Sequence, residues 1–153
     1  MIDQDLNNVE PLVYESKIGV PYYWWAGDTA TRFLEAIRDK GELWGTRCPE
    51  CGKVFVPPRK SCPRCFGQQT SWEKVGPGGT VVTYTVARKK REAIPEDVPV
   101  VFALIRLDGA DTAMLHKIGG VDPDKVSTGM RVKPRFAEER KGHIRDIECF
   151  IPD

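Results

Sequence analysis

The sequence predicts a mainly β protein that begins with a helical arm, continues into a metal-binding ribbon and ends in a small barrel or sandwich. Two C-x-x-C pairs within residues 48–65 predict the ribbon. Five short β-rich segments between residues 80 and 151, separated by turn residues and without a helical crossover, predict the barrel or sandwich. We therefore expect an N-terminal arm and helix at residues 1–43, the ribbon at 44–70 and the β domain at 71–153.

A helix is expected to begin near residue 28, where Asp28 or Thr29 is a suitable cap, and to end at Gly41. One apolar stripe follows at helical spacing: Ala30, Phe33, Leu34 and Ile37. A helix of about three turns is not stable alone. We therefore expect the stripe to pack on the aromatic residues 22–25 that precede it, or on another protein chain.

Four of the five cysteines predict a closed metal site. The expected ligands are Cys48, Cys51, Cys62 and Cys65. Each pair is followed by a glycine, Gly52 or Gly67, which lets backbone amides approach the sulfurs. Four thiolates leave no position for water, which is typical of a structural zinc site. Iron in the same four thiolates, giving a rubredoxin-like electron carrier, is the main alternative. A redox dithiol is a further one, disfavoured because two pairs so close together argue against independent redox work.

The β domain follows a Gly-Pro-Gly-Gly turn signal at residues 76–79. Its expected strands lie at residues 80–86, 100–107, 113–118, 130–137 and 144–151. Between the first two strands runs a charged loop that contains a cluster of cations: Arg88, Lys89, Lys90 and Arg91. This cluster is either a solvated surface loop or a clamp for a phosphate-bearing ligand.

Candidate nucleophiles are few outside the metal site. Cys149 is the remaining thiol, and its alternation with Ile147 and Ile151 predicts that it is buried. His116 is expected mainly at the surface end of a strand, although the sequence leaves open an approach to Cys149. We assign no catalytic residue.

The overall charge is nearly balanced, with 23 Lys and Arg against 22 Asp and Glu and a net charge of +1. This balance disfavours nucleic-acid binding, which draws on surplus cations. The sequence contains no run of about 18 apolar residues, so no membrane-spanning helix is predicted. The first basic residue, Lys17, follows several acidic ones, unlike a signal peptide, so a cytoplasmic location is expected.

Several motifs together resemble a known family. They are T-R-C-P-E-C-G-K-V-F-V-P-P-R at residues 46–59, C-P-R-C at 62–65, V-P-V-V-F-A-L-I-R-L-D-G at 98–109 and G-G-V-D-P-D at 119–124. They resemble the zinc-ribbon/OB-fold family of acyl-CoA-associated proteins, long catalogued as a domain of unknown function, over residues 20–137. The resemblance implies a rubredoxin-like zinc ribbon, with the four cysteines as zinc ligands, followed by a five-stranded OB-fold barrel.

The resemblance also implies a function. Members are typically non-catalytic subunits that bind a thiolase or a thiolase-like acyltransferase, and some bind an acyl-CoA hydratase. Such a subunit can help to shape the coenzyme A channel, for which the candidate phosphate contacts here are Arg88, Lys89, Lys90 and Arg91. The alternative is a nucleic-acid-binding protein, because OB folds and zinc ribbons often bind nucleic acid.

Overall fold

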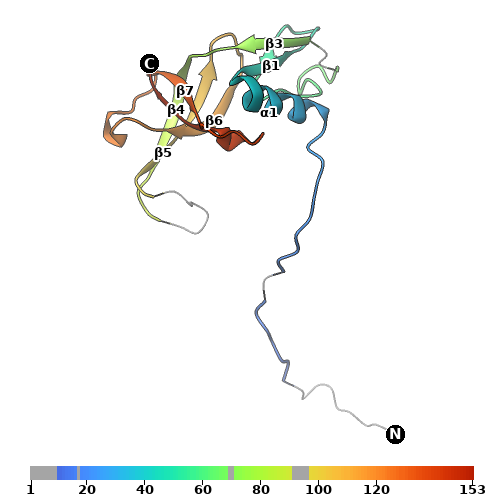
Figure 1. Cartoon of the computed structure of the whole chain (residues 1–153), viewed down its shortest axis with the longest axis vertical. Coiled ribbons are helices and arrows are strands. Elements are labelled where there is room, and N and C mark those ends of the chain that lie inside the picture. The colour runs from blue at the N-terminus through green and yellow to red at the C-terminus, as the bar shows by residue number, and fades with distance from the viewer. Residues whose placement is uncertain (1–9, 17, 69–70, 91–96) are drawn as a thin grey trace.

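The protein is described from a computed structural model that covers residues 10–16, 18–68, 71–90 and 97–153. Its folded body carries an extended N-terminal segment that runs far from the rest of the chain (Figure 1). In chain order the elements are α1 (Asp28–Lys40), β1 (Leu43–Arg47), β2 (Val54–Phe55), β3 (Ser71–Val75), β4 (Gly79–Ala87), β5 (Val100–Leu107), β6 (Ala113–Ile118), η2 (Pro123–Lys125), β7 (Arg131–Phe136), η3 (Ile144–Asp146) and β8 (Ile147–Pro152).

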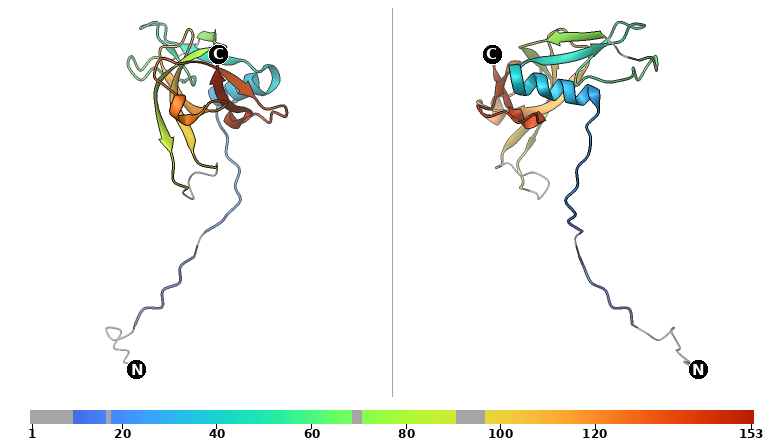
Figure 2. Two further views of the ribbon diagram at one scale, coloured as in Figure 1. Left: turned by 90° about the vertical axis from the view of Figure 1, so that its left-hand side faces the viewer. Right: turned by 45° about the vertical axis from the view of Figure 1, so that its right-hand side comes forward.

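The extended segment, here called the arm, comprises residues 10–16 and 18–27 and forms neither helix nor strand. Both further views show it leaving the body at the start of α1 (Figure 2). The aromatic side chains at its end are exposed, Trp24 at 74% and Trp25 at 76%. None of the helices in the described ranges is long and apolar enough to span a bilayer.

Helix α1 packs on the body rather than on the arm. Phe33 and Ile37 are buried in a core shared with the ribbon and the barrel, so the expectation that they pack on residues 22–25 or on another chain is wrong. The expected cap is also wrong, because Gly27 precedes the helix and no side chain bonds the first turn. Gly41 ends the helix as predicted, with a φ of 63° and its N–H bonded to the Ile37 carbonyl at 3.0 Å.

The ribbon is a three-stranded antiparallel sheet in the order β2-β1-β3. Gly45 lies in its central strand, where an added Cβ would stand 2.8 Å from the carbonyl oxygen of Phe55. Only glycine allows this close approach of the two strands. Residues 71–75 pair with β1, from Leu43↔Val75 to Arg47↔Ser71, so the chain completes this sheet before it enters the barrel.

The barrel is closed and five-stranded, in the order β4-β5-β6-β8-β7. All neighbours are antiparallel except β6 and β8, which run parallel and share the single pair Ile118↔Phe150. The predicted five-stranded OB-fold barrel is thereby confirmed, and its second and third strands have the predicted bounds. Residues 144–146, predicted as strand, form the 3₁₀ turn η3 instead.

One apolar core runs through the helix, the ribbon and the barrel. Its buried members include Ile37 from α1, Val54 from β2 and Ile105 from β5. The turn between β5 and β6 joins ribbon and barrel further, because its side chains bond the backbone of the ribbon. A single folded body therefore holds the metal-binding knuckles against the barrel.

Candidate metal centre

The two cysteine pairs form two similar backbone turns, here called knuckles. In the first, Cys48 N–H bonds the Lys53 carbonyl at 2.9 Å and Gly52 N–H bonds the Cys48 carbonyl at 2.9 Å. In the second, Cys62 N–H bonds the Gly67 carbonyl at 3.0 Å and Phe66 N–H bonds the Cys62 carbonyl at 2.9 Å. The left-handed position is Gly52, with a φ of 71°, in the first knuckle. In the second knuckle it is Phe66, with a φ of 61°.

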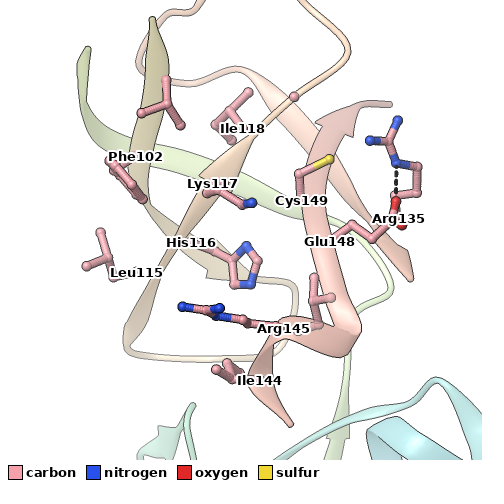
Figure 3. A pocket seen from close by; sticks show the side chains of 13 residues that line it. Phe102, Leu115, His116, Lys117, Ile118, Arg135, Ile144, Arg145, Glu148 and Cys149 are labelled. Carbon is pink, nitrogen blue, oxygen red and sulfur yellow. Dashed lines mark hydrogen bonds and ion pairs between the residues drawn. The ribbon is translucent and has the colours of Figure 1, made fainter. Parts of the chain in front are cut away.

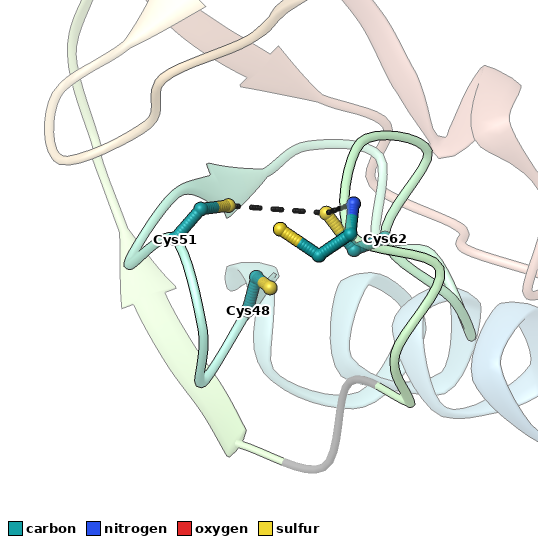
Figure 4. Close-up of side chains that lie close together, drawn as sticks. Cys48, Cys51 and Cys62 are labelled. Carbon is teal, nitrogen blue, oxygen red and sulfur yellow. Dashed lines mark hydrogen bonds between the residues drawn. The ribbon is translucent and has the colours of Figure 1, made fainter.

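The knuckles bring all four thiols to one point. Their Sγ atoms lie within 4.8 Å of one another, and Cys51 Sγ is 3.8 Å from Cys62 Sγ (Figure 4). Zinc–sulfur bonds of about 2.3 Å in a tetrahedron place the sulfurs roughly 3.8 Å apart. The arrangement thus fits a four-coordinate zinc ion, which would neutralise the thiolates and tie the two knuckles together.

The backbone prepares one of these thiols for a metal. The amide N–H of Cys65 lies 3.4 Å from Cys62 Sγ, and this contact is the main cause that lowers the pKa of the Cys62 thiol to about 7. Burial, joined by the neighbouring thiols, raises the pKa of Cys65 to about 12. Four thiolates side by side therefore need a cation, and bound metal deprotonates its thiol ligands.

Three polar side chains fix the knuckles to their surroundings. Thr46 is fully buried, and its Oγ1 accepts from Arg59 N at 2.9 Å and donates to the Arg59 carbonyl at 3.0 Å. From the β5–β6 turn, Asp111 Oδ2 accepts from Val54 N at 2.8 Å, and Thr112 Oγ1 accepts from the amide of Val56 at 2.8 Å. No local pattern in the sequence indicates the bonds of Asp111 and Thr112, because their partners lie more than 50 residues away.

The predicted cationic cluster is only partly used within the chain. Arg88 forms an ion pair with Asp124, and Lys90 Nζ lies 3.5 Å from an Asp97 carboxylate oxygen. Lys89 is exposed at the end of β4. Arg91 lies outside the described residues.

A second set of cations projects from the outer face of β7, and each is paired with a carboxylate. Arg131 binds Asp108 through both of its terminal nitrogens, at 2.7 and 2.5 Å. The other two pairs are Lys133 with Asp153 at 3.3 Å and Arg135 with Glu148 at 3.0 Å. This strand therefore does not present an uncompensated basic stripe.

The remaining candidates occupy the barrel. Cys149 is buried as predicted, and burial raises the pKa of its thiol. The expectation that His116 lies at the surface is wrong, because its Nδ1 is buried and burial lowers its pKa. Both groups are neutral at pH 7, and a protonated thiol is a poor nucleophile. Strand parity could have indicated this, since His116 pairs with the buried Ala103.

Comparison with known families agrees with this geometry. Residues 36–71 match the family model described as the rubredoxin-like zinc ribbon domain of ChsH2, and residues 72–137 match its C-terminal OB-fold domain. The fold and site thus define a zinc-ribbon and OB-fold protein that carries structural zinc. A DUF35 domain-containing scaffold protein of Methanocaldococcus jannaschii is 32% identical over 102 residues, which cover 65% of this chain and 71% of that protein. The chain belongs to the DUF35 family.

A further relative and two solved structures are also similar to this chain. A DUF35 domain-containing scaffold protein of Methanothermobacter thermautotrophicus is 28% identical over 69% of this chain and 79% of its own length. Among solved structures, a chain of the Ltp2-ChsH2(DUF35) aldolase superposes with a TM-score of 0.63 at 25% identity, covering 82% of this chain and 95% of that one. A DUF35 protein of unknown function from Sulfolobus solfataricus has the same fold, with a TM-score of 0.63 at 22% identity over 83% of this chain and 87% of its own.

Proposed function

We propose that this chain is a non-catalytic, zinc-stabilised subunit that docks on a thiolase-type acyl-CoA acyltransferase in the cytoplasm. The partner would supply the catalytic groups for cleaving or forming a β-ketoacyl-CoA. The observation that carries the proposal is the exposed apolar arm, whose large apolar side chains are not buried by the folded body.

The arm presents many large apolar side chains to solvent. Its exposed members are Leu12, Val13, Tyr14, Ile18, Val20, Tyr22, Tyr23, Trp24 and Trp25. Monomeric proteins rarely expose so much contiguous apolar surface, and tryptophan and tyrosine are the residues most enriched at interface hot spots. We infer that the arm lies along a partner protein, which covers these side chains.

The comparisons support a partner that is an enzyme. Relatives are named scaffold proteins, and ChsH2 was solved as part of an aldolase with Ltp2. The aromatic end of the arm resembles the beginnings of family members that pair with thiolases in the degradation of aromatic compounds and steroid side chains. The small subunit of benzoylsuccinyl-CoA thiolase is one such member.

The inventory of reactive groups also supports a non-catalytic role. The four clustered thiols suit a closed zinc site, in which no coordination position remains for a substrate. Cys149 and His116 are both neutral, and no hydrogen bond joins them in the described part of the chain. Catalysis by the complex is therefore assigned to the partner.

We further propose that Lys89 and Lys90 help to hold the phosphates of coenzyme A at the interface with the enzyme. They lie next to each other at the end of β4, beside Arg88. Lysine is a common phosphate ligand, acting as a point charge. Arg88 and Lys90 are expected to contribute less than Lys89, because Asp124 and Asp97 already compensate part of their charge.

Nucleic-acid binding is the less favoured function. The cations on the outer face of β7 each have a carboxylate partner, and the net charge of the whole chain is +1. Phosphate-backbone binding depends on uncompensated cations. Submicromolar, salt-sensitive binding of a fluorescent oligonucleotide would favour that function instead.

Copurification tests the docking proposal. The tagged chain, coexpressed with a candidate thiolase from the same organism, should elute with that enzyme from a sizing column. Replacing Trp24 and Trp25 together by alanine should weaken the complex by about 30-fold or more, because a hot-spot residue contributes at least about 2 kcal/mol. Phe66→Ala is the matched control, since Phe66 is 83% exposed but lies outside the arm. Elution of the unmodified chain alone would refute the proposal.

Kinetics of the complex test the coenzyme A contacts. Replacing Lys89 and Lys90 by alanine should raise the KM for acyl-CoA about tenfold, with little change in kcat, because a lost charged contact contributes about 1.5–3 kcal/mol. The control replaces Lys53 and Lys60, two exposed lysines of the ribbon, by alanine. An unchanged KM for acyl-CoA in the Lys89 and Lys90 variant would mean that residues 88–90 form a solvated surface loop without a phosphate contact.

A further inference from the structure

A cleft of about 700 Å³ opens in the barrel wall between β6 and β8. These two strands share only the pair Ile118↔Phe150, followed by the bond from Gly119 N to the Phe150 carbonyl at 2.8 Å. The cleft lies beside this short seam, with β6 on one wall and η3 and β8 on the other (Figure 3). Its volume is within the range of small-molecule sites.

One part of the cleft is apolar. Phe102 and Leu115 line it from β5 and β6, and Ile144 and Ile147 line it from the opposite wall. Leu115 is 64% exposed although it lies in the middle of a barrel strand. Such a surface gains free energy when an apolar group covers it, at roughly 25 cal/mol per Å².

The polar part of the cleft carries a surplus of positive charge. Its lining includes Lys117, Arg135, Arg145 and Glu148, which gives three cations against one carboxylate. Glu148 is engaged by Arg135, with Nε and Oε2 3.0 Å apart. Arg145, in contrast, forms no ion pair with a carboxylate among the residues that the structure describes, and its side chain points into the cleft (Figure 3). The cleft is therefore suited to an anion.

His116 adds a polar group that lacks a partner. Its Nδ1 is buried and forms no hydrogen bond with the described residues, while its ring packs edge-on against Phe150 at 5.5 Å. A buried polar atom left without a hydrogen bond costs about 1–3 kcal/mol. Burial lowers the pKa of this imidazole, so it is neutral at pH 7 and can exchange a hydrogen bond with a ligand.

The wall that carries Arg145 is held firmly. Asp146 Oδ2 accepts from the backbone amides of Lys141, Gly142 and His143 at 3.0, 2.7 and 3.1 Å. Although burial opposes ionisation, these three amides lower the pKa of Asp146. The turn η3 is thereby fixed, so the backbone that carries Arg145 need not be ordered when a ligand binds.

We propose that the cleft between β6 and β8 binds a small organic carboxylate with an apolar body. The carboxylate would lie against Arg145 and Lys117, and the apolar body would cover Leu115 and Phe102. A small turn of the His116 ring would bring its Nδ1 to a polar atom of the ligand. The whole cleft lies within this chain, so binding does not depend on the proposed enzyme partner and extends the function of the subunit beyond docking.

Two ligands of the same shape, one charged and one neutral, test whether the cleft binds a carboxylate. The full chain is used without a partner protein. Amide NMR spectra are recorded during titration with 4-phenylbutyrate and with the neutral 4-phenylbutyramide. We expect 4-phenylbutyrate to shift signals of residues 115–118 and 144–149, and the amide to bind at least about tenfold more weakly, because a hydrogen bond to a charged group is lost. Equal binding of both compounds, or shifts confined to other regions, would overturn the proposal.

Three variants refine the assignment. Arg145→Gln should weaken 4-phenylbutyrate binding about tenfold, and His116→Phe should weaken it several-fold while keeping a ring against Phe150. Arg106→Gln is the control, because Arg106 is exposed on the neighbouring strand β5 but does not line the cleft. Melting temperatures are measured for all three. Unchanged affinity in a folded Arg145→Gln protein would show that the cleft does not hold the carboxylate.

Discussion

The ribbon and the barrel share one core but are stabilised in different ways. The barrel closes on itself and buries side chains from all five strands, among them Val81, Ile105 and Phe150. The ribbon has a strand of only two residues, β2, and its smaller second cluster consists of cysteines around Phe55. The barrel is thus stabilised chiefly by apolar burial, whereas the ribbon requires an ion and bonds from its neighbour.

The largest effect that separates the two regions should come from loss of the metal. Cys62→Ser leaves three thiolates and should abolish zinc binding, which in isolated peptides contributes about 10–16 kcal/mol. We expect the amides of residues 43–75 to lose protection from hydrogen exchange, while those of β5 remain protected. Zinc content is measured on the same samples.

Cys149→Ser is the matched control for this experiment, because Cys149 is buried in the barrel far from the cluster in sequence. It should retain one zinc per chain. A Cys62→Ser protein with full zinc content and an unchanged melting temperature would contradict the metal assignment. If the unmodified protein is red and contains iron, the site holds iron rather than zinc.

A barrel substitution should have the converse result. Ile105→Ala leaves a cavity at a fully buried position, with an expected loss of about 2–5 kcal/mol in the free energy of unfolding. Zinc content should stay at one per chain. The neighbouring Leu104→Ala, on the outer face of β5, should cost less than about 0.5 kcal/mol. Chemical denaturation distinguishes the two, and equal losses would mean that the barrel core is not the main source of stability.

The link between the regions should have an intermediate effect. Asp111→Ala removes the acceptor of Val54 N–H and should cost about 1–3 kcal/mol. Because β2 leads out of the first knuckle, zinc should also transfer to a chelator faster. Glu138→Ala, an exposed carboxylate change outside this turn, is the control. Unaltered zinc transfer in Asp111→Ala would show that the ribbon holds its metal without help from the barrel.

The smallest effect concerns the two knuckles themselves. Phe66 adopts the left-handed conformation that Gly52 adopts in the first knuckle, which costs a residue with a side chain roughly 1–2 kcal/mol. Phe66→Gly should therefore stabilise the zinc-bound protein by up to about 1 kcal/mol, since the added freedom of the unfolded chain offsets part of the gain. A thermal melt measures it, and clear destabilisation would show that the exposed ring has a role in the second knuckle.

The sequence predicts best where a local pattern determines the structure. The spacing of the four cysteines predicted the metal site, and the apolar run at residues 100–107, ended by Asp108-Gly109, predicted β5 and the start of β6 at the observed bounds. It predicted poorly where contacts are distant in sequence. The packing of Phe33 and Ile37 on the barrel, the bond from Asp111 to Val54 and the unpartnered His116 all depend on tertiary placement.

The β5–β6 turn also matters for engineering. Tips of hairpins are usually the safest places to insert a tag, graft a peptide or open a chain by circular permutation. Here the tip carries Asp111 and Thr112, whose side chains accept hydrogen bonds from the backbone amides of Val54 and Val56 and so hold β2 in place. An insertion between them would separate two folded parts rather than extend a loop.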